Sequence, residues 1–112
     1  MRITREHVER YTNGDCAVLA LELAKADPTW FIATTAAEDH AFVVNADRTE
    51  AIDVEGRRPL KDLLESWKGV LGYVAQDFES GRNTLEAEGW WIHEGANPTQ
   101  AARLAQELLS QD

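Results

Sequence analysis

The 112-residue sequence is poor in cysteine and in long apolar segments. Cys16 is its single cysteine, which excludes an intramolecular disulfide and any zinc site built from several cysteines. No apolar run approaches the ~18 residues that a membrane-spanning helix needs. The charged beginning, "MRITREHVER", lacks the apolar stretch of a secretory signal. We therefore expect a cytoplasmic protein without a membrane partner, whose thiol is inert, reactive or used by another chain.

Basic residues are also scarce. Eleven lysines and arginines stand against twenty acidic residues, so the net charge is -9. Such a charge disfavours direct binding to nucleic acid phosphates and suits either a basic protein partner or simple solubility. The acidic excess is concentrated between Gln76 and Glu94, where five carboxylates accompany one arginine.

No repeat, low-complexity tract or linker divides the chain, so we expect one domain over residues 1–112. Residues 16, 19, 20 and 23 follow the spacing of one buried helical face, and Asp27-Pro28 ends that helix. A short helix over 4–11, ended by Asn13-Gly14, precedes it. Runs of β-branched and aromatic residues predict strands at 30–35, 40–45 and 50–54, the last two forming a hairpin.

The second half of the chain gives clear signals only in places. Helical spacing begins at Pro59 and continues to Trp67, whereas "VLGYVA" (70–75) fits a helix or a strand and "GWWIHEGA" (89–96) fits a strand or a loop. Asn97-Pro98 is a typical start for a last helix. The expected fold class is α+β, with the helix that carries Cys16 packed on a small antiparallel sheet and with a C-terminal helix.

Three residue types used in thiol catalysis occupy informative positions. Cys16 opens a helix, whose N-terminal N–H groups and dipole stabilise a thiolate. His40 opens one strand and Asp53 ends the next, so a hairpin would bring them together. A histidine can then take the thiol proton while the carboxylate orients its ring.

This order of residues and elements resembles the papain-like cysteine peptidase superfamily in its compact form, which includes NlpC/P60-type and transglutaminase-like enzymes and small phage and bacterial papain-like proteins. The resemblance rests on "NGDCAVLAL", "DHAFVV" and "EAIDVEG", within residues 11–56. It implies that Cys16 is the nucleophile, His40 the base and Asp53 the orienting residue of a cysteine hydrolase or acyltransferase. Papain-type enzymes place an oxyanion-binding glutamine before the cysteine; here Asn13 is the candidate donor.

Other interpretations remain open. Cys16 shares its stripe with leucines, as a buried structural cysteine would. The alternative function is that of a non-enzymatic, acidic phage or bacterial binding or inhibitor protein that keeps the papain-like fold. Its partner would be basic and would contact Glu86, Glu88, Trp90 and Trp91. A metal site is disfavoured because His40 and nearby carboxylates lack a second histidine or cysteine. We expect no cofactor; the substrate of the enzyme would be a peptide, an amide or a thioester.

Overall fold

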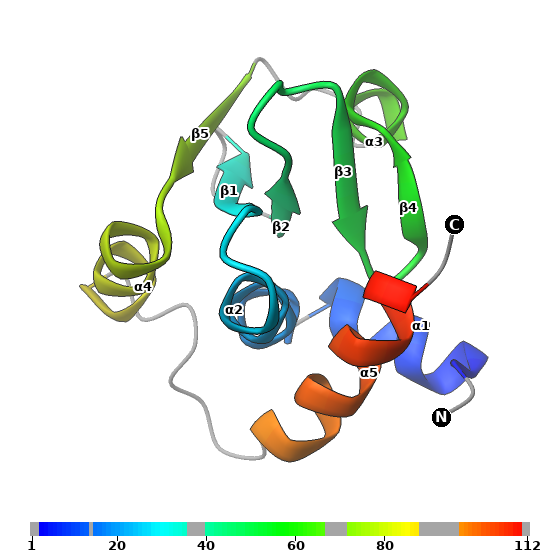
Figure 1. Cartoon of the computed structure of the whole chain (residues 1–112). Coiled ribbons are helices and arrows are strands. Elements are labelled where there is room, and N and C mark those ends of the chain that lie inside the picture. Colours follow the sequence, from blue (N-terminus) through cyan, green and yellow to red (C-terminus); the bar gives the residue numbers. More distant parts are fainter. Residues whose placement is uncertain (1–2, 14, 36–39, 67–71, 88–96, 111–112) are drawn as a thin grey trace.

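The computed structural model describes residues 3–13, 15–35, 40–66, 72–87 and 97–110. Within these ranges the chain forms five helices and a five-stranded antiparallel sheet, which confirms the α+β class and the C-terminal helix (Figure 1). The elements in chain order are α1 (Arg5–Asn13), α2 (Cys16–Ala26), β1 (Phe31–Thr35), β2 (Ala41–Val44), β3 (Glu50–Asp53), β4 (Gly56–Pro59), α3 (Leu60–Ser66), β5 (Tyr73–Gln76), α4 (Phe78–Ala87) and α5 (Pro98–Ser110).

The sheet has the order β4-β3-β2-β1-β5, so its first four strands form a meander. The predicted hairpin between β2 and β3 is confirmed by the pairing of Val44 with Ala51. Its turn is closed by the Asn45 side chain, whose Oδ1 accepts the N–H groups of Thr49 and Glu50. Arg48 takes a left-handed conformation in this turn, with φ at 62°.

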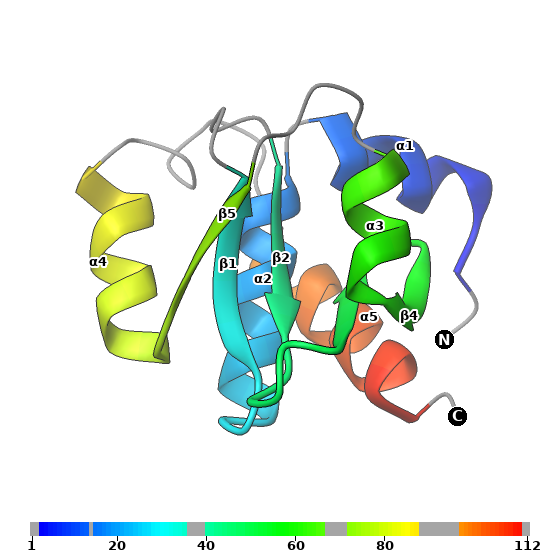
Figure 2. The same ribbon diagram turned by 90° about the horizontal axis from the view of Figure 1, so that it is seen from above.

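Strand alternation divides the core between the two faces of the sheet. On one face, which we call the α2 face, Ala41, Val43 and Ile52 pack in the core that contains α2 and α5. On the opposite face, the α3 face, Phe42 and Ala51 pack with α3. Figure 2 shows α3 in front of the sheet and α2 behind it.

Helix α2 is the central element of the larger core. Eight of its eleven residues are buried, and α5 covers it from the side away from the sheet. The buried stripe of α5 is the one that the sequence predicts: Ala101, Leu104, Ala105 and Leu108. The prediction that the Cys16 helix packs on an antiparallel sheet is therefore confirmed.

Several details differ from the sequence expectations. Strand β4 and helix α4 were not expected, and "VLGYVA" contributes the beginning of strand β5. Asp15 is the N-cap residue of α2 but makes no side-chain cap hydrogen bond; its carboxylate pairs with Arg10 at 2.6 Å instead. Residues 89–96, whose strand or loop character was left open, lie outside the described residues. In the described ranges, no helix combines the length and apolarity required to cross a membrane.

Candidate active site

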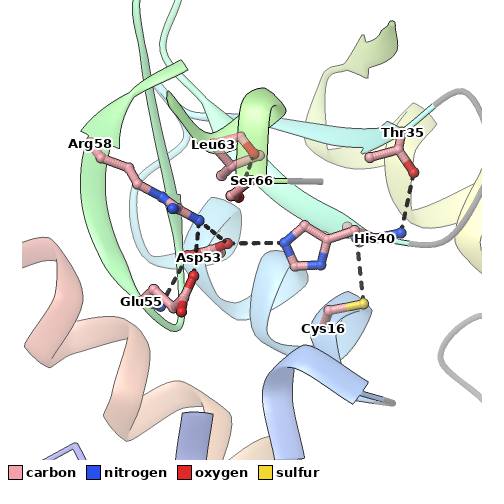
Figure 3. A network of polar contacts seen from close by, with 9 residues as sticks. Cys16, Thr35, His40, Asp53, Glu55, Arg58, Leu63 and Ser66 are labelled. Carbon is pink, nitrogen blue, oxygen red and sulfur yellow. Dashed lines mark hydrogen bonds and ion pairs between the residues drawn. The ribbon is translucent and has the colours of Figure 1, made fainter. Parts of the chain in front are cut away.

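The three candidate catalytic residues come from the ends of three elements. Cys16 is the first residue of α2, His40 immediately precedes β2, and Asp53 is the last residue of β3. All three are buried, with Cys16 the most exposed at 7%, against 1% for His40 and 4% for Asp53. The fold thus brings together groups that are up to 37 positions apart at one end of the sheet (Figure 3).

The hairpin register explains why His40 and Asp53 meet. Asp53 lies on the α3 face with Ala51, and His40 lies on the same face as Phe42, two residues further along. His40 Nε2 is 3.0 Å from Asp53 Oδ2. The prediction that these side chains lie within hydrogen-bond reach on one face of the sheet is confirmed.

Cys16 approaches the pair from the opposite layer. Its Sγ atom accepts the Ala41 backbone N–H at 3.4 Å, which ties the beginning of α2 to the beginning of β2. In Figure 3 the His40 ring lies between Asp53 and Cys16, with the Nε2 side on the carboxylate. Because Asp15 does not cap α2 with its side chain, its carboxylate does not occupy the first amides of this helix.

The surroundings favour a charged His40. Burial lowers the pKa of this imidazole. Hydrogen bonds with Asp53 and Cys16, together with the negative charges of both, outweigh the effect of burial and raise the pKa to about 9. Burial also raises the pKa of Asp53, yet the His40 hydrogen bond and the positive charges of Arg58 and His40 outweigh it and lower that pKa. At neutral pH the arrangement therefore favours an imidazolium beside a carboxylate.

The position of His40 is further fixed through its backbone and its ring. The Thr35 N–H donates to the His40 carbonyl at 3.0 Å, and the His40 N–H donates to Thr35 Oγ1 at 3.2 Å. The imidazole stacks on Phe42, with centroids 5.8 Å apart and planes inclined by 21°. These contacts hold the ring without using either ring nitrogen.

Sequence reasoning missed Arg58, which contacts Asp53 from β4. Arg58 Nη2 donates to Asp53 Oδ2 and to Glu55 Oε2, both at 3.1 Å, while the Glu55 N–H donates to Asp53 Oδ1 at 3.0 Å. The signal was present in "EGRRP": as a strand paired with β3 it places Arg58 opposite Ala51, on the face that carries Asp53.

Most of the remaining predicted site residues lie outside the described part of the chain. Asn13 is the last residue of α1, but its side chain lies outside the described part of the chain, as do Glu88, Trp90 and Trp91. Glu86 is exposed on α4, 4.0 Å from Arg82. The described residues contain no group of three histidine, cysteine or acidic side chains arranged to hold a metal ion.

Comparison with known proteins gives no identification. The chain matches no protein-family model, no curated protein and no solved structure. Its function must therefore be argued from the geometry of its own residues.

Proposed function

We propose that this protein is a cysteine hydrolase or acyltransferase that acts on an amide, thioester or peptide bond. Cys16 is the nucleophile and His40 is the acid and base. Asp53 orients His40 and stabilises its protonated form. The observation that carries the proposal is the position of His40, bonded to Asp53 at 3.0 Å and interacting with the sulfur of a cysteine that opens a helix. The papain-like resemblance implies the same three roles.

The proposed reaction has two steps. The Cys16 thiolate attacks the substrate carbonyl carbon, and the carbonyl π electrons move to oxygen. The intermediate collapses, the bond to the leaving group breaks, and His40 gives that group its proton. Water or an amine then attacks the thioester while neutral His40 takes a proton from it, and the Cys16 thiolate leaves. The acyl group is released as an acid or transferred to the amine.

Two features of the chain support a thiolate at Cys16. The Ala41 N–H points at Sγ, and hydrogen bonds to a charged acceptor are stronger than those to a neutral one. The beginning of α2 adds the positive end of a helix dipole. The Cys16 N–H, in the first turn, is the backbone donor available to a developing oxyanion, with Asn13 as the side-chain candidate.

The proposed chemistry uses only side chains of the protein and the substrate, so it calls for no cofactor. A cytoplasmic location agrees with this proposal, because reducing conditions keep a single catalytic thiol free.

Selective alkylation of the native protein tests the proposal. We expect iodoacetamide at pH 7 to modify Cys16 in the native wild-type protein, as measured by intact mass. In His40→Asn the rate of this modification should be at least tenfold lower. His7→Asn is the matched control, since His7 lies on α1 and bonds to Thr4 and Gln100 instead. Acyl transfer is followed with p-nitrophenyl acetate, with Cys16→Ala as the blank. If Cys16 is labelled only after unfolding, or if wild type and His40→Asn are alkylated at equal rates, the role of Cys16 as the nucleophile is refuted.

The binding-protein alternative makes the opposite demand. It is favoured if Cys16→Ser keeps the biological activity of the protein while Glu86→Lys with Glu88→Lys removes it. The exposed position of Glu86 on α4 is compatible with such a contact. This alternative is the second candidate, because binding through the surface of α4 would leave the buried contact between His40 and Asp53 without a function.

A further inference from the structure

One carboxylate oxygen at this site contacts two cationic side chains. Asp53 Oδ2 lies 3.0 Å from His40 Nε2 and 3.1 Å from Arg58 Nη2. The same Arg58 nitrogen donates its other hydrogen to Glu55 Oε2 at 3.1 Å. Charges therefore alternate along a chain from His40 through Asp53 and Arg58 to Glu55 (Figure 3). The Asp53 side chain is 5% exposed and that of Arg58 is 23% exposed, so water screens this contact only in part.

We propose that Arg58 is a positioning residue of the candidate site, which fixes the Asp53 carboxylate and, by sharing its negative charge, limits how tightly the proton is held on His40. The catalytic consequence rests on the proposed function, whereas the charge sharing is measurable without any substrate. Glu55 acts in the opposite direction, because it takes up part of the Arg58 charge.

The physical reason lies in the two tasks of His40. The imidazolium must release its proton to the leaving group, and the neutral ring must then accept one from water. A carboxylate that bonded only His40 would hold the charged form more strongly. A second cation on Asp53 Oδ2 weakens that hold while it keeps the carboxylate ionised. Four ionisable side chains face His40 directly or through this chain of contacts: Cys16 from α2, Asp53 from β3, Arg58 from β4 and Glu55 from the β3–β4 turn.

Strand β4 supplies a matched control. Arg57 is the neighbour of Arg58 and also contacts a carboxylate, with Nε 2.6 Å from Glu50 Oε2. Arg57 lies over the Trp30 ring and pairs in register with Ile52, so it belongs to the face of the sheet opposite to Asp53. Substitutions at Arg57 and Glu50 therefore alter an equivalent ion pair without touching His40.

Imidazole titration by NMR measures the proposed effect in the full-length protein. His40→Asn identifies the His40 signals among those of the three histidines. In Arg58→Met we expect the His40 titration midpoint to rise by about one pH unit, the size typical for loss of a neighbouring charge. Arg58→Lys should return it towards the wild-type value, and Arg57→Met should leave it in place.

A second variant gives a shift of the opposite sign and protects the test against misfolding of Arg58→Met. Glu55 is half exposed, so Glu55→Gln is expected to fold, and it should lower the His40 midpoint by giving the whole Arg58 charge to Asp53. Glu50→Gln is its control and should cause no shift. An unchanged or lowered midpoint in Arg58→Met, or an unchanged or raised one in Glu55→Gln, would overturn the proposal.

The pH profile separates this inference from the proposed function. If both hold, turnover of p-nitrophenyl acetate by Arg58→Met falls severalfold at pH 7 and recovers at higher pH, because the neutral fraction of His40 returns. A purely structural role would lower turnover equally at every pH and would contradict the inference. If the His40 titration shifts as expected but neither turnover nor labelling depends on Cys16, the proposed enzymatic function is refuted and the charge sharing by Arg58 still holds.

Discussion

Two buried carboxylates beside the candidate site, Asp15 and Asp53, each have an arginine partner. Asp15 pairs with Arg10 at 2.6 Å and Asp53 with Arg58 at 3.1 Å. An unpaired buried charge is costly, so these contacts offset much of the penalty of placing acids at 3% and 4% exposure. The difference between the two pairs is that Asp53 also contacts His40, which turns a structural ion pair into a group able to influence proton transfer.

The raised pKa of His40 predicts a loss of stability in mild alkali. Its folded-state pKa of about 9 lies above the ordinary 6.5, so the native protein holds this proton more tightly than the unfolded chain. The resulting stabilisation is complete below pH 6.5 and is lost as the pH rises through about 9, at up to about 1.4 kcal/mol per pH unit. Urea unfolding between pH 6 and 9.5 measures the slope.

Two variants check the origin of that slope. His40→Asn should remove it, and Cys16→Ala should reduce it, since contact with Cys16 contributes to the raised pKa of His40. A slope that persists in His40→Asn would show that another group is responsible.

Asp53→Asn provides a separate prediction for the thiol. Without the carboxylate, His40 loses its principal support for the charged form, and Cys16 loses the cation that stabilises its thiolate. We expect iodoacetamide to modify Cys16 roughly tenfold more slowly at pH 7 in this variant, because a neutral His40 no longer takes up the thiol proton. Glu50→Asp, at an exposed ion pair, serves as the control. Equal alkylation rates would contradict an active role for Asp53.

At the scale of elements, periodicity predicted α2, α5 and the first three strands because their apolar spacing is regular and their ends carry turn residues. Asn97 illustrates this, since its Oδ1 accepts the Gln100 N–H as a helix cap does. Strand β4 was missed because "GRRP" is polar. It is an edge strand, where proline is tolerated and where Arg57 and Arg58 both pair with carboxylates.

In the candidate site, too, local sequence signals predicted some residues and missed others. A cysteine at a helix start and a short hairpin were enough to predict that Cys16, His40 and Asp53 lie close together. Arg58 and Thr35 could not be assigned in the same way, because their contacts depend on which strands pair and in which register. The pairing of Asp15 with Arg10 was equally invisible to local patterns, because an aspartate before a helix is usually a side-chain cap.

Helix α4, the other missed element, yields a prediction from its close approach to β1. A Cβ atom added at Gly81 would lie 2.7 Å from the Ile32 Cβ, which is fixed to the strand backbone and cannot rotate away. We expect Gly81→Ala to lower the free energy of unfolding by about 1–2 kcal/mol, because overpacking exceeds the gain in helix propensity. Asn83→Ala, at an exposed position of α4, should be neutral or slightly stabilising. Equal stability of the two variants would contradict this close packing.

At the scale of the whole molecule, the net charge of -9 sets the response to salt. Exposed ion pairs such as Arg82 with Glu86 contribute little, whereas repulsion among the excess carboxylates acts over longer distances. Raising NaCl from 10 to 200 mM shortens the screening length from about 30 to below 10 Å, and we expect it to increase stability in urea by on the order of 1 kcal/mol.

The same experiment distinguishes the surface charge from the candidate site. Glu79→Gln with Glu86→Gln, two exposed changes on α4, should reduce the salt dependence of unfolding. The His40 titration midpoint should move much less with salt than the unfolding free energy does, because the charges that hold its proton are buried and close. Stability that falls with added salt would show that attractive surface pairs outweigh the acidic excess. A His40 midpoint that follows the salt concentration would place its controlling charges at the surface rather than on Asp53 and Arg58.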